Sequence, residues 1–280
     1  MSGTLYLCAT PIGNLEDITL RVLRILREAD IIAAEDTRHT RKLLNHFEIT
    51  TPLTSYHEHN SRAKGEHLLD ILRSGRSVAL VTDAGMPAVS DPGADIVRLC
   101  HEHGLPVTCA PGASAHSAAL AVSGLGGGEF IFGGFLPRGT KERRQRIADL
   151  ADEHRTVIFY EAPHRLRETL QDLAAGLQAN RKAAIVSELT KMYEKCVIGN
   201  LPEISETAAQ TELRGEFVIV LGGASKQDLQ DRERAQYSGM SAAEHVEAYI
   251  QTGLDPKAAM KAAARDRGVS KSVIYKEMLS

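Results

Sequence analysis

The stretch Val78-Ala79-Leu80-Val81-Thr82-Asp83-Ala84-Gly85-Met86-Pro87-Ala88-Val89-Ser90-Asp91-Pro92-Gly93 carries most of the information about the fold. Its first four residues are apolar and predict a buried strand, and a polar segment rich in proline and glycine follows directly. A segment with helical periodicity comes next, at residues 96–103. Strand, loop and helix in this order are typical of one unit of a parallel α/β sheet.

The same alternation extends on both sides of this stretch. Apolar runs predict three further strands, and two segments of helical period predict helices between them. The predicted strands are residues 5–9, 31–34 and 107–110, and the predicted helices are residues 20–29 and 63–72. We therefore predict a first α/β domain over residues 1–123.

Four glycines within residues 124–128 mark a domain boundary. They precede a strand instead of following one, which predicts a hinge and not a phosphate-binding loop. The second half has more strands than the first, so we predict a mixed α/β domain over residues 124–225. Its predicted strands are 130–133, 157–160, 183–187, 195–198 and 216–221, and its predicted helices are 141–153 and 163–173.

Residues 225–238 are polar and predict a solvated linker to a third unit, residues 239–280. Three helices are predicted there, at 242–251, 256–267 and 272–279, with Asp255 and Ser270 as caps and Gly253 and Gly268 as stop signals. The arrangement resembles a helix-turn-helix. Residues 256–280 hold six basic and two acidic residues, a net charge of +4, which fits either a nucleic-acid-binding appendage or a solubilising cap.

Composition limits the class of protein. Of 280 residues, 43% are hydrophobic and 25% charged, as in globular proteins, and 33 basic against 36 acidic residues exclude a uniformly basic nucleic-acid coat. No apolar run is long enough to span a membrane, and a strand-like segment follows Met1 directly, so we expect a cytoplasmic protein. The cysteines lie far apart and are interpreted as buried thiols, with neither disulfide nor metal site, at Cys8, Cys100, Cys109 and Cys196.

Ligands in open α/β sheets bind beyond the carboxyl ends of the strands, so the loops there are candidate sites. The loop 82–93 contains two aspartates, two prolines and two glycines, which indicates a preformed ligand loop. The alternative is that Asp83 and Asp91 form local turns and Ser90 caps a helix. The loop 111–115 has side chains small enough to leave room for a flat ligand. The alternative is that it only begins a helix.

Two further loops follow the first two predicted strands, at residues 10–15 and 35–38. If these strands are neighbours, their loops lie side by side and bring acids, an arginine and an amide into one cleft wall. Alternatively, Glu35 and Asp36 only cap the helix that follows them. In the second half, acidic and basic residues at 160–165, 187–191 and 214–216 predict a polar cleft between the domains, and the basic run 137–146 fits a phosphate backbone or a solvated helix start.

Several common signatures are missing: the sequence has no GxxxxGK[ST], no GxGxxG after a first strand and no GxSxG. This disfavours ordinary nucleotide hydrolases, dinucleotide dehydrogenases and α/β-hydrolases. What the sequence does contain, in order, is ATPIGNLEDIT, AAEDTRHTRKLL, VTDAGMPAVSDPG, PGASA, GFLPRG, YEAPHR, SELTK and RGEFVIV. This set resembles the ribosomal RNA small subunit methyltransferase I branch of the tetrapyrrole methylase superfamily, over nearly the whole chain.

The resemblance implies two α/β domains with S-adenosylmethionine bound in the cleft between them, usually in a homodimer. It implies methylation of a cytidine ribose 2′-hydroxyl in 16S ribosomal RNA, either free or in the small ribosomal subunit. The implied cofactor-binding residues are Asp83, Ala84, Gly85, Ser114, Ala115, Ala162, Glu188, Leu189, Gly215 and Glu216. One departure matters: porphyrin-modifying relatives carry a GxGPGD-type turn where this chain has Pro11-Ile12-Gly13-Asn14.

A ribose hydroxyl is a poor nucleophile while protonated, so we expect a carboxylate base, either Glu35 or Asp36, with Arg38 holding a phosphate. The other residues expected to contact substrate are Pro11, Asn14, Arg138, Lys141, Arg143 and Arg165. Two alternatives stay open: a corrin or porphyrin methyltransferase, and a non-catalytic RNA-binding assembly factor. The basic segments argue against the first, because a small macrocycle needs neither of them.

Overall fold

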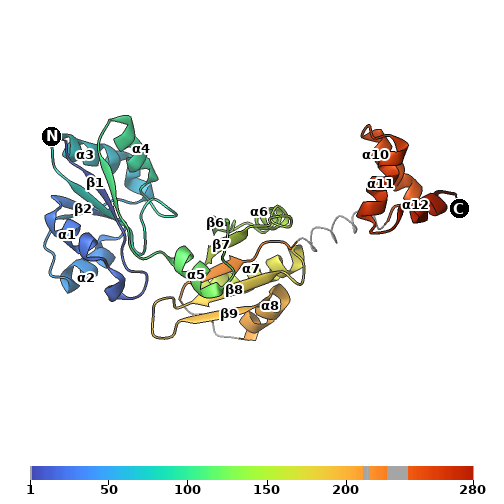
Figure 1. Ribbon diagram of the computed structural model, residues 1–280. Coiled ribbons are helices and arrows are strands. Elements are labelled where there is room, and N and C mark those ends of the chain that lie inside the picture. Colours follow the sequence, from blue (N-terminus) through green and yellow to red (C-terminus); the bar gives the residue numbers. More distant parts are fainter. Residues whose placement is uncertain (1, 211–212, 214, 226–238, 280) are drawn as a thin grey trace.

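The computed structural model describes residues 2–210, 213, 215–225 and 239–279. Two five-stranded sheets follow each other along the chain, and a three-helix bundle ends it (Figure 1). The segment that we predicted as a linker lies outside the described residues, except for Ser225.

The first sheet is wholly parallel, in the order β3-β2-β4-β1-β5. Side chains alternate between its faces, so that Ala79 and Val81 of β4 pack in one core and Val78 and Leu80 in the other. The strands are β1 (Leu5–Cys8), β2 (Ile31–Ala34), β3 (Leu53–Ser55), β4 (Val78–Val81) and β5 (Val107–Ala110); the helices are α1 (Leu20–Glu28), α2 (Thr37–His46), α3 (Ser61–Arg73) and α4 (Ala94–Glu102), with short 3-10 turns at Leu15–Asp17 and Glu58–Asn60. The predicted parallel α/β unit is confirmed.

The strand order corrects one expectation. We took β1 and β2 as neighbours, but β4 lies between them and pairs with both. The loop that follows β4 therefore separates the loops that follow β1 and β2. Crossover connections let a later strand enter between two earlier ones, which local sequence patterns do not reveal.

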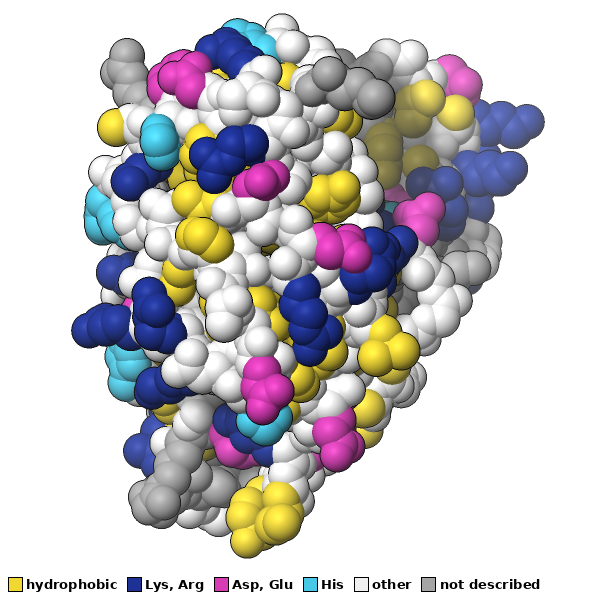
Figure 2. All heavy atoms as spheres, turned by 90° about the vertical axis from the view of Figure 1, so that its left-hand side faces the viewer, with side chains coloured by type: hydrophobic (Ala, Val, Ile, Leu, Met, Phe, Trp, Pro, Cys, Tyr) yellow, Lys and Arg dark blue, Asp and Glu magenta, His cyan; other side chains and the backbone are white. Residues whose placement is uncertain are grey.

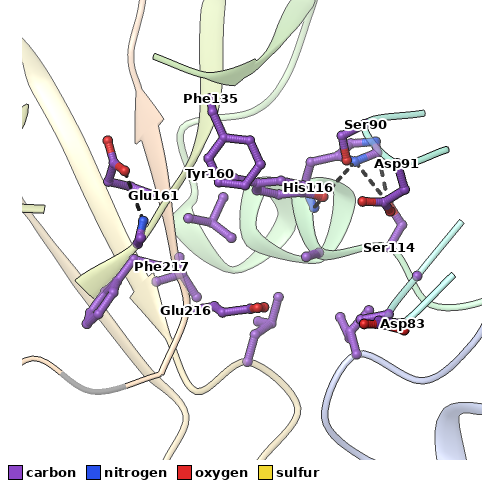
Figure 3. A pocket seen from close by; sticks show the side chains of 18 of the residues that line it. Asp83, Ser90, Asp91, Ser114, His116, Phe135, Tyr160, Glu161, Glu216 and Phe217 are labelled. Carbon is purple, nitrogen blue, oxygen red and sulfur yellow. Dashed lines mark hydrogen bonds between the residues drawn. The ribbon is translucent and has the colours of Figure 1, made fainter. Parts of the chain in front are cut away.

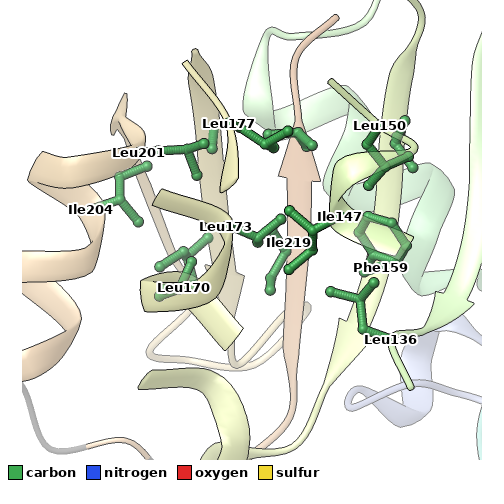
Figure 4. Packing of buried hydrophobic residues seen from close by; sticks show 14 of the residues in the cluster. Leu136, Ile147, Leu150, Phe159, Leu170, Leu173, Leu177, Leu201, Ile204 and Ile219 are labelled. Carbon is green, nitrogen blue, oxygen red and sulfur yellow. The ribbon is translucent and has the colours of Figure 1, made fainter. Parts of the chain in front are cut away.

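The second sheet is mixed, as predicted, in the order β6-β7-β10-β8-β9, with only β6 and β7 parallel. Helices α6, α7 and α8 cover one face and enclose a core of leucine, isoleucine and phenylalanine side chains (Figure 4). The strands are β6 (Phe130–Phe135), β7 (Thr156–Glu161), β8 (Lys182–Ser187), β9 (Lys195–Asn200) and β10 (Phe217–Leu221); the helices are α6 (Thr140–Ala148), α7 (Pro163–Gly176) and α8 (Leu201–Gln210).

Helix α5 (Ala115–Ser123) covers the other face of this second sheet. Its Ala119 packs with Ile158, Ala184 and Val220 in one buried cluster. We placed the domain boundary after residue 123, but the packing places it before α5, in the loop 111–114. The glycines at 124–128 end α5, with Gly124 in the left-handed conformation at φ 63°, and lead into β6.

The C-terminal bundle consists of α10 (Ala242–Gln251), α11 (Pro256–Asp266) and α12 (Lys271–Leu279), around a small core of its own. Asp255 caps α11 as predicted, since its side chain accepts hydrogen bonds from the backbone N–H groups of Lys257 and Ala258. Gly253 and Gly268 follow α10 and α11 with φ of 96° and 64°. The bundle stands apart from both sheets in Figure 1.

The cysteines are only partly as expected. Cys8 and Cys100 are buried, but Cys109 is exposed and Cys196 half-buried. Both exceptions lie on strands at a sheet edge, β5 and β9, where a side chain has neighbouring side chains from an adjacent strand on one side only. Among the described helices, none combines the length and the apolar character that crossing a bilayer requires.

Candidate active site

A cavity of about 580 Å³ lies between the two sheets. The first sheet contributes the loops after β2 and β4, and the second contributes the end of β7, the loop after β8 and the start of β10. The N-terminus of α5 closes the space between them, so residues far apart in sequence face one another (Figure 3). The volume is typical of a site for a ligand of cofactor size.

The loop after β4 is fixed by hydrogen bonds to its neighbours. Thr10 and Gly85 exchange backbone hydrogen bonds of 2.9 and 3.1 Å, and the carboxylate of Asp83 accepts one from the backbone N–H of Asp36, at 3.2 Å. Gly85 has a φ of 81°, a conformation that favours glycine. The loop is therefore held in place before any ligand arrives.

Glu35 and Asp36 have different roles. Glu35 lines the cavity, and its pKa is raised, chiefly by burial and then by the charge of Asp83. Asp36 caps α2: it accepts from the backbone N–H of Arg38 at 2.7 Å and pairs with the Arg38 guanidinium at 2.8 Å, which lowers its pKa. Of the two candidate bases, the capping alternative thus describes Asp36, and only Glu35 faces the cavity.

The cavity carries an excess of negative charge. Glu35, Asp83 and Asp91 line it from the first sheet and Glu216 from the second. Burial and these three neighbours raise the pKa of Asp91 to about 6. Within the residues that the structure describes, no lysine or arginine forms an ion pair with any of the four, so the cavity favours a ligand with positive charge.

One wall of the cavity is aromatic. The phenolic oxygen of Tyr160 accepts a hydrogen bond from the backbone N–H of His116 at 3.2 Å, and the His116 ring stacks on Phe132 at 4.6 Å. The hydroxyl of Ser114 lies 3.1 Å from Nδ1 of His116. Burial lowers the pKa of His116, which favours the neutral form of this imidazole. The wall provides a flat, weakly polar surface, with Phe135 beside Tyr160.

Two acidic residues of the second sheet fix the local backbone. Glu161 is buried and accepts hydrogen bonds from the backbone of Ala162 at 2.9 Å and from Thr169 at 2.7 Å. Glu188 pairs with Lys191 at 3.1 Å. A Cβ on Gly215 would come within 2.0 Å of the Glu188 carboxylate, so the glycine leaves room for this side chain.

Most of the residues expected to bind a cofactor surround this one cavity. They are Asp83, Ala84, Gly85, Ser114, Ala115, Ala162, Glu188, Leu189 and Glu216, while Gly215 lies beside them against Glu188. Asp91 belongs to the loop 82–93, which the sequence predicted to bind a ligand, but it was not named among the cofactor-binding residues, and neither were His116 and Tyr160. The position of Asp91 in the same loop as Asp83 was the only available signal.

The residues expected to bind substrate are more scattered. Pro11 and Asn14 lie in the loop after β1, where Asn14 caps a 3-10 turn, and Arg38 is 90% exposed at the start of α2. Arg138 and Lys141 are exposed at the start of α6.

Two of these expectations need correction. The Arg143 side chain is 1% exposed and bonds to Asp172 at 2.7 Å and to Glu168, so it joins α6 to α7 and is not available to RNA. Arg165 donates to the carbonyls of Leu136 and Pro137, at 2.9 and 3.1 Å, and approaches Glu161. Both guanidiniums stabilise the second domain from within. A basic run in a sequence does not reveal which of its members are buried.

The sequence of this chain is similar to those of known methyltransferases. The sequence profile described as Tetrapyrrole (Corrin/Porphyrin) Methylases matches residues 4–205. A protein of Halalkalibacterium halodurans named ribosomal RNA small subunit methyltransferase I is 50% identical over 98% of this chain and 93% of its own length. One of the same name from Bacillus subtilis is 46% identical over the same shares.

Solved structures show the same fold at low identity. A cobalt precorrin-4 methyltransferase aligns with a TM-score of 0.60 and 19% identity, over 78% of this chain and 94% of its own. A uroporphyrin-III C-methyltransferase from Thermus thermophilus, in complex with S-adenosylhomocysteine, aligns with a TM-score of 0.55 and 22% identity, over 79% and 97%. The chain therefore belongs to the tetrapyrrole (corrin/porphyrin) methylase family, in its ribosomal RNA small subunit methyltransferase I branch, and is an S-adenosylmethionine-dependent methyltransferase.

Proposed function

We propose that the cavity between the two sheets binds S-adenosylmethionine and that the enzyme methylates a cytidine ribose 2′-hydroxyl in 16S ribosomal RNA. The observation that carries the first part is the set of four carboxylates for which the described part of the chain holds no ion-pair partner, Glu35, Asp83, Asp91 and Glu216. S-adenosylmethionine has a sulfonium and an ammonium against a single carboxylate, so its net charge complements the cavity.

The residues present fit this cofactor in size and in chemistry. The fixed loop of Asp83 and Gly85 provides a carboxylate and close backbone approach, and Ser114 and Ala115 provide small side chains beside it. Ala162, Leu189 and Glu216 complete the opposite wall. When bound there, the cofactor supplies a methyl group that the sulfonium has already activated for transfer. The protein then has to hold the ribose in line and accept its proton.

We assign proton acceptance to Glu35. Its carboxylate lies in the cavity, and its raised pKa makes it a stronger base than an exposed carboxylate. Asp36 is a weaker base, because Arg38 stabilises its ionised form. Its side chain caps the N-terminus of α2. Arg38 is exposed beside this position and is suited to a phosphate of the RNA.

The substrate assignment rests on the relatives and on the loop after β1. The proteins named ribosomal RNA small subunit methyltransferase I are 41–50% identical to this chain, whereas the tetrapyrrole enzymes are 19–22% identical. Pro11 to Asn14 replace the glycine-rich turn of porphyrin-modifying relatives, and Gly13 packs on the second domain: a Cβ there would lie 2.8 Å from the Leu189 carbonyl. These observations favour RNA over a tetrapyrrole.

We further infer that the enzyme works in the cytoplasm as a homodimer and takes RNA or the small ribosomal subunit as its partner. An apolar patch on α5 and β9 supports self-association: Val122 is 44% and Ile198 54% exposed, and Cys196 Sγ lies 3.8 Å from the Val122 carbonyl. Sedimentation velocity of the purified chain measures whether it is a dimer. We expect Ile198→Lys, which places a charge in the apolar patch, to shift the protein to a monomer.

One incubation tests the proposed reaction against its alternatives. Purified enzyme receives methyl-labelled S-adenosylmethionine with either small ribosomal subunits from a strain lacking this methylation, naked 16S ribosomal RNA, or a tetrapyrrole precursor. We expect label in a ribose of the RNA. Label in the tetrapyrrole would identify a porphyrin or corrin enzyme, and RNA binding without label in any substrate would identify a non-catalytic assembly factor.

A further inference from the structure

The C-terminal bundle separates its charges between its helices. Among residues 239–279, helix α10 carries the acids Glu244 and Glu247 and no lysine or arginine. All six basic residues of this range lie on α11, on α12 or in the turn between them: Lys257, Lys261, Arg265, Arg267, Lys271 and Lys276. The positive charge of the bundle is thus confined to its last two helices and the turn between them, although the whole protein is slightly acidic.

Three of the basic residues form a stripe along α11. Lys257, Lys261 and Arg265 follow one another at spacings of four residues, so they lie on the same face of the helix, and all three are exposed. Arg265 bonds to its neighbour Asp266 at 3.2 Å and still has 79% of its side chain exposed. Like charges at this spacing repel and weaken a helix, so packing and stability give no reason for the stripe.

Helix α12 is unusually exposed for a helix with apolar residues. Of residues 271–278 only Ile274 is buried, while Tyr275 is 56% and Met278 39% exposed. Lys271, Ser272, Tyr275 and Lys276 occupy contiguous positions on one side of the helix. An exposed aromatic ring between two lysines is the combination that binds single-stranded nucleic acid, through base stacking and phosphate contacts.

The other basic segment of the chain is less available. In α6, Arg143 is buried and unavailable, and Arg144 pairs with Asp172 at 3.2 Å while 69% of its side chain stays exposed. On the face that Figure 2 shows, lysine and arginine side chains lie alongside acidic and apolar ones. The bundle, by contrast, keeps Lys257, Lys261, Lys271 and Lys276 all exposed, so it can contact a polyanion.

We propose that α11 and α12 form a docking face for single-stranded segments of ribosomal RNA. Lys257, Lys261 and Lys276 neutralise phosphates there, and Tyr275 stacks on a base. The inference rests on the proposed RNA substrate. It adds that the RNA is held at two places, by the bundle for affinity and by the cavity for chemistry, because the bundle has a separate core.

The test uses the full chain and a charge-matched control. Lys257→Gln, Lys261→Gln and Lys276→Gln are combined in one variant, and Lys42→Gln, Lys182→Gln and Lys195→Gln, all at exposed positions outside the bundle, in another. Binding to fluorescent 16S ribosomal RNA transcript is measured between 50 and 300 mM salt. Each lost phosphate contact should lower the slope of log affinity against log salt by about 0.7. We expect this slope to fall by about two units in the bundle variant, which loses three phosphate contacts, and to change little in the control.

A second pair of variants separates stacking from charge. Tyr275→Ala should weaken RNA binding roughly 5- to 100-fold, and Tyr275→Phe, which keeps the ring, should remain within about threefold of wild type. Affinity for S-adenosylhomocysteine, measured by calorimetry, should be unchanged in every variant, which also shows that the catalytic units are folded.

The outcomes distinguish this inference from the proposed function. If wild-type enzyme methylates ribosomal RNA but the bundle variants bind RNA with wild-type affinity and salt slope, the docking face is refuted. The exposed side of α12 is then a surface for a protein or for a second copy of the chain. If wild-type enzyme neither binds nor methylates ribosomal RNA, the proposed function itself fails.

Discussion

At the scale of single residues, position relative to the cavity separates residues that are neighbours in sequence. Glu35 and Asp36 are adjacent, yet one faces the cavity and the other caps a helix. Asp83 and Asp91 share a loop and line the same cavity, and burial together with the neighbouring charges raises the pKa of Asp91 to about 6.

The first prediction compares Glu35→Gln with Asp36→Asn. We expect Glu35→Gln to lower kcat by roughly 10²- to 10⁴-fold, the usual contribution of a general base, while affinity for S-adenosylmethionine changes little. Asp36→Asn is the matched control, because asparagine caps a helix as well as aspartate does. Equal kcat values for wild type and Glu35→Gln would remove this carboxylate from the mechanism.

The second prediction concerns pH. The pKa of Asp91 is raised from 3.8 to about 6 in the folded protein, so the folded state binds this proton more tightly than the unfolded state. The stability contributed by this proton is complete below pH 4 and is lost as pH rises through 6. We therefore expect Asp91→Asn to raise the Tm of the ligand-free enzyme at pH 7 but not at pH 3.5. Thermal melts at both pH values check this; equal Tm values at pH 7 would contradict it.

The same variant should bind the cofactor less tightly, because it removes one of the carboxylates that favour a cation. Calorimetry at pH 7.5 measures this affinity. The same affinity as wild type would show that Asp91 does not face the positive part of the ligand.

At the scale of elements, a buried guanidinium holds α6 against α7. Arg143 donates to Asp172 on α7, and Arg144 donates to the same carboxylate. Ile147 of α6 and Leu173 of α7 belong to one apolar cluster, which appears in Figure 4. The ion pair and the apolar contacts together fix where the basic helix lies on the second sheet.

The third prediction follows from this pair. Arg143→Met removes the buried partner of the Asp172 carboxylate and leaves only the exposed Arg144 beside it. Removing one member of a buried ion pair lowers the free energy of unfolding by about 3–5 kcal/mol. Chemical denaturation should show a loss of this size, whereas Arg138→Met, at an exposed position, should change the unfolding free energy by less than about 0.5 kcal/mol. A stable Arg143→Met variant with weakened RNA binding would restore the residue to the RNA-binding set.

At the scale of the whole molecule, the site exists only because two sheets meet. Carboxylates of the first sheet and Glu216 of the second face the same space, and α5 joins the two units. The C-terminal bundle has its own six-residue core and shares none of the cavity residues. Cofactor binding and RNA docking are thus separable parts of the chain.

The fourth prediction is that deleting residues 239–280 leaves cofactor affinity unchanged. The cavity is built wholly from earlier residues, so calorimetry with S-adenosylhomocysteine should give the wild-type value. RNA binding should weaken and become less sensitive to salt, as phosphate contacts are lost. Loss of cofactor binding in a folded truncated protein would show that the bundle supports the catalytic units.

Local sequence patterns were sufficient to predict the parallel first unit, the mixed second unit and the helices of the bundle, because apolar periodicity and turn residues act over about ten neighbouring residues. They also identified the loop of Asp83, and nine of the ten cofactor-binding residues that the family resemblance implied line the cavity. Weak or short patterns left β3, α2 and α8 out of the prediction. Strand β3 has three half-buried residues, which give no clear alternation.

Four features became visible only in the folded chain: β4 separates β1 from β2, α5 packs on the second sheet, Arg143 is buried and Cys109 is exposed. The tertiary structure also placed Asp91 and Glu216, which lie far apart in sequence, close enough for their charges to interact. These features depend on which elements become neighbours in space. Strand order and burial follow from the packing of the whole chain, which a local sequence pattern does not contain.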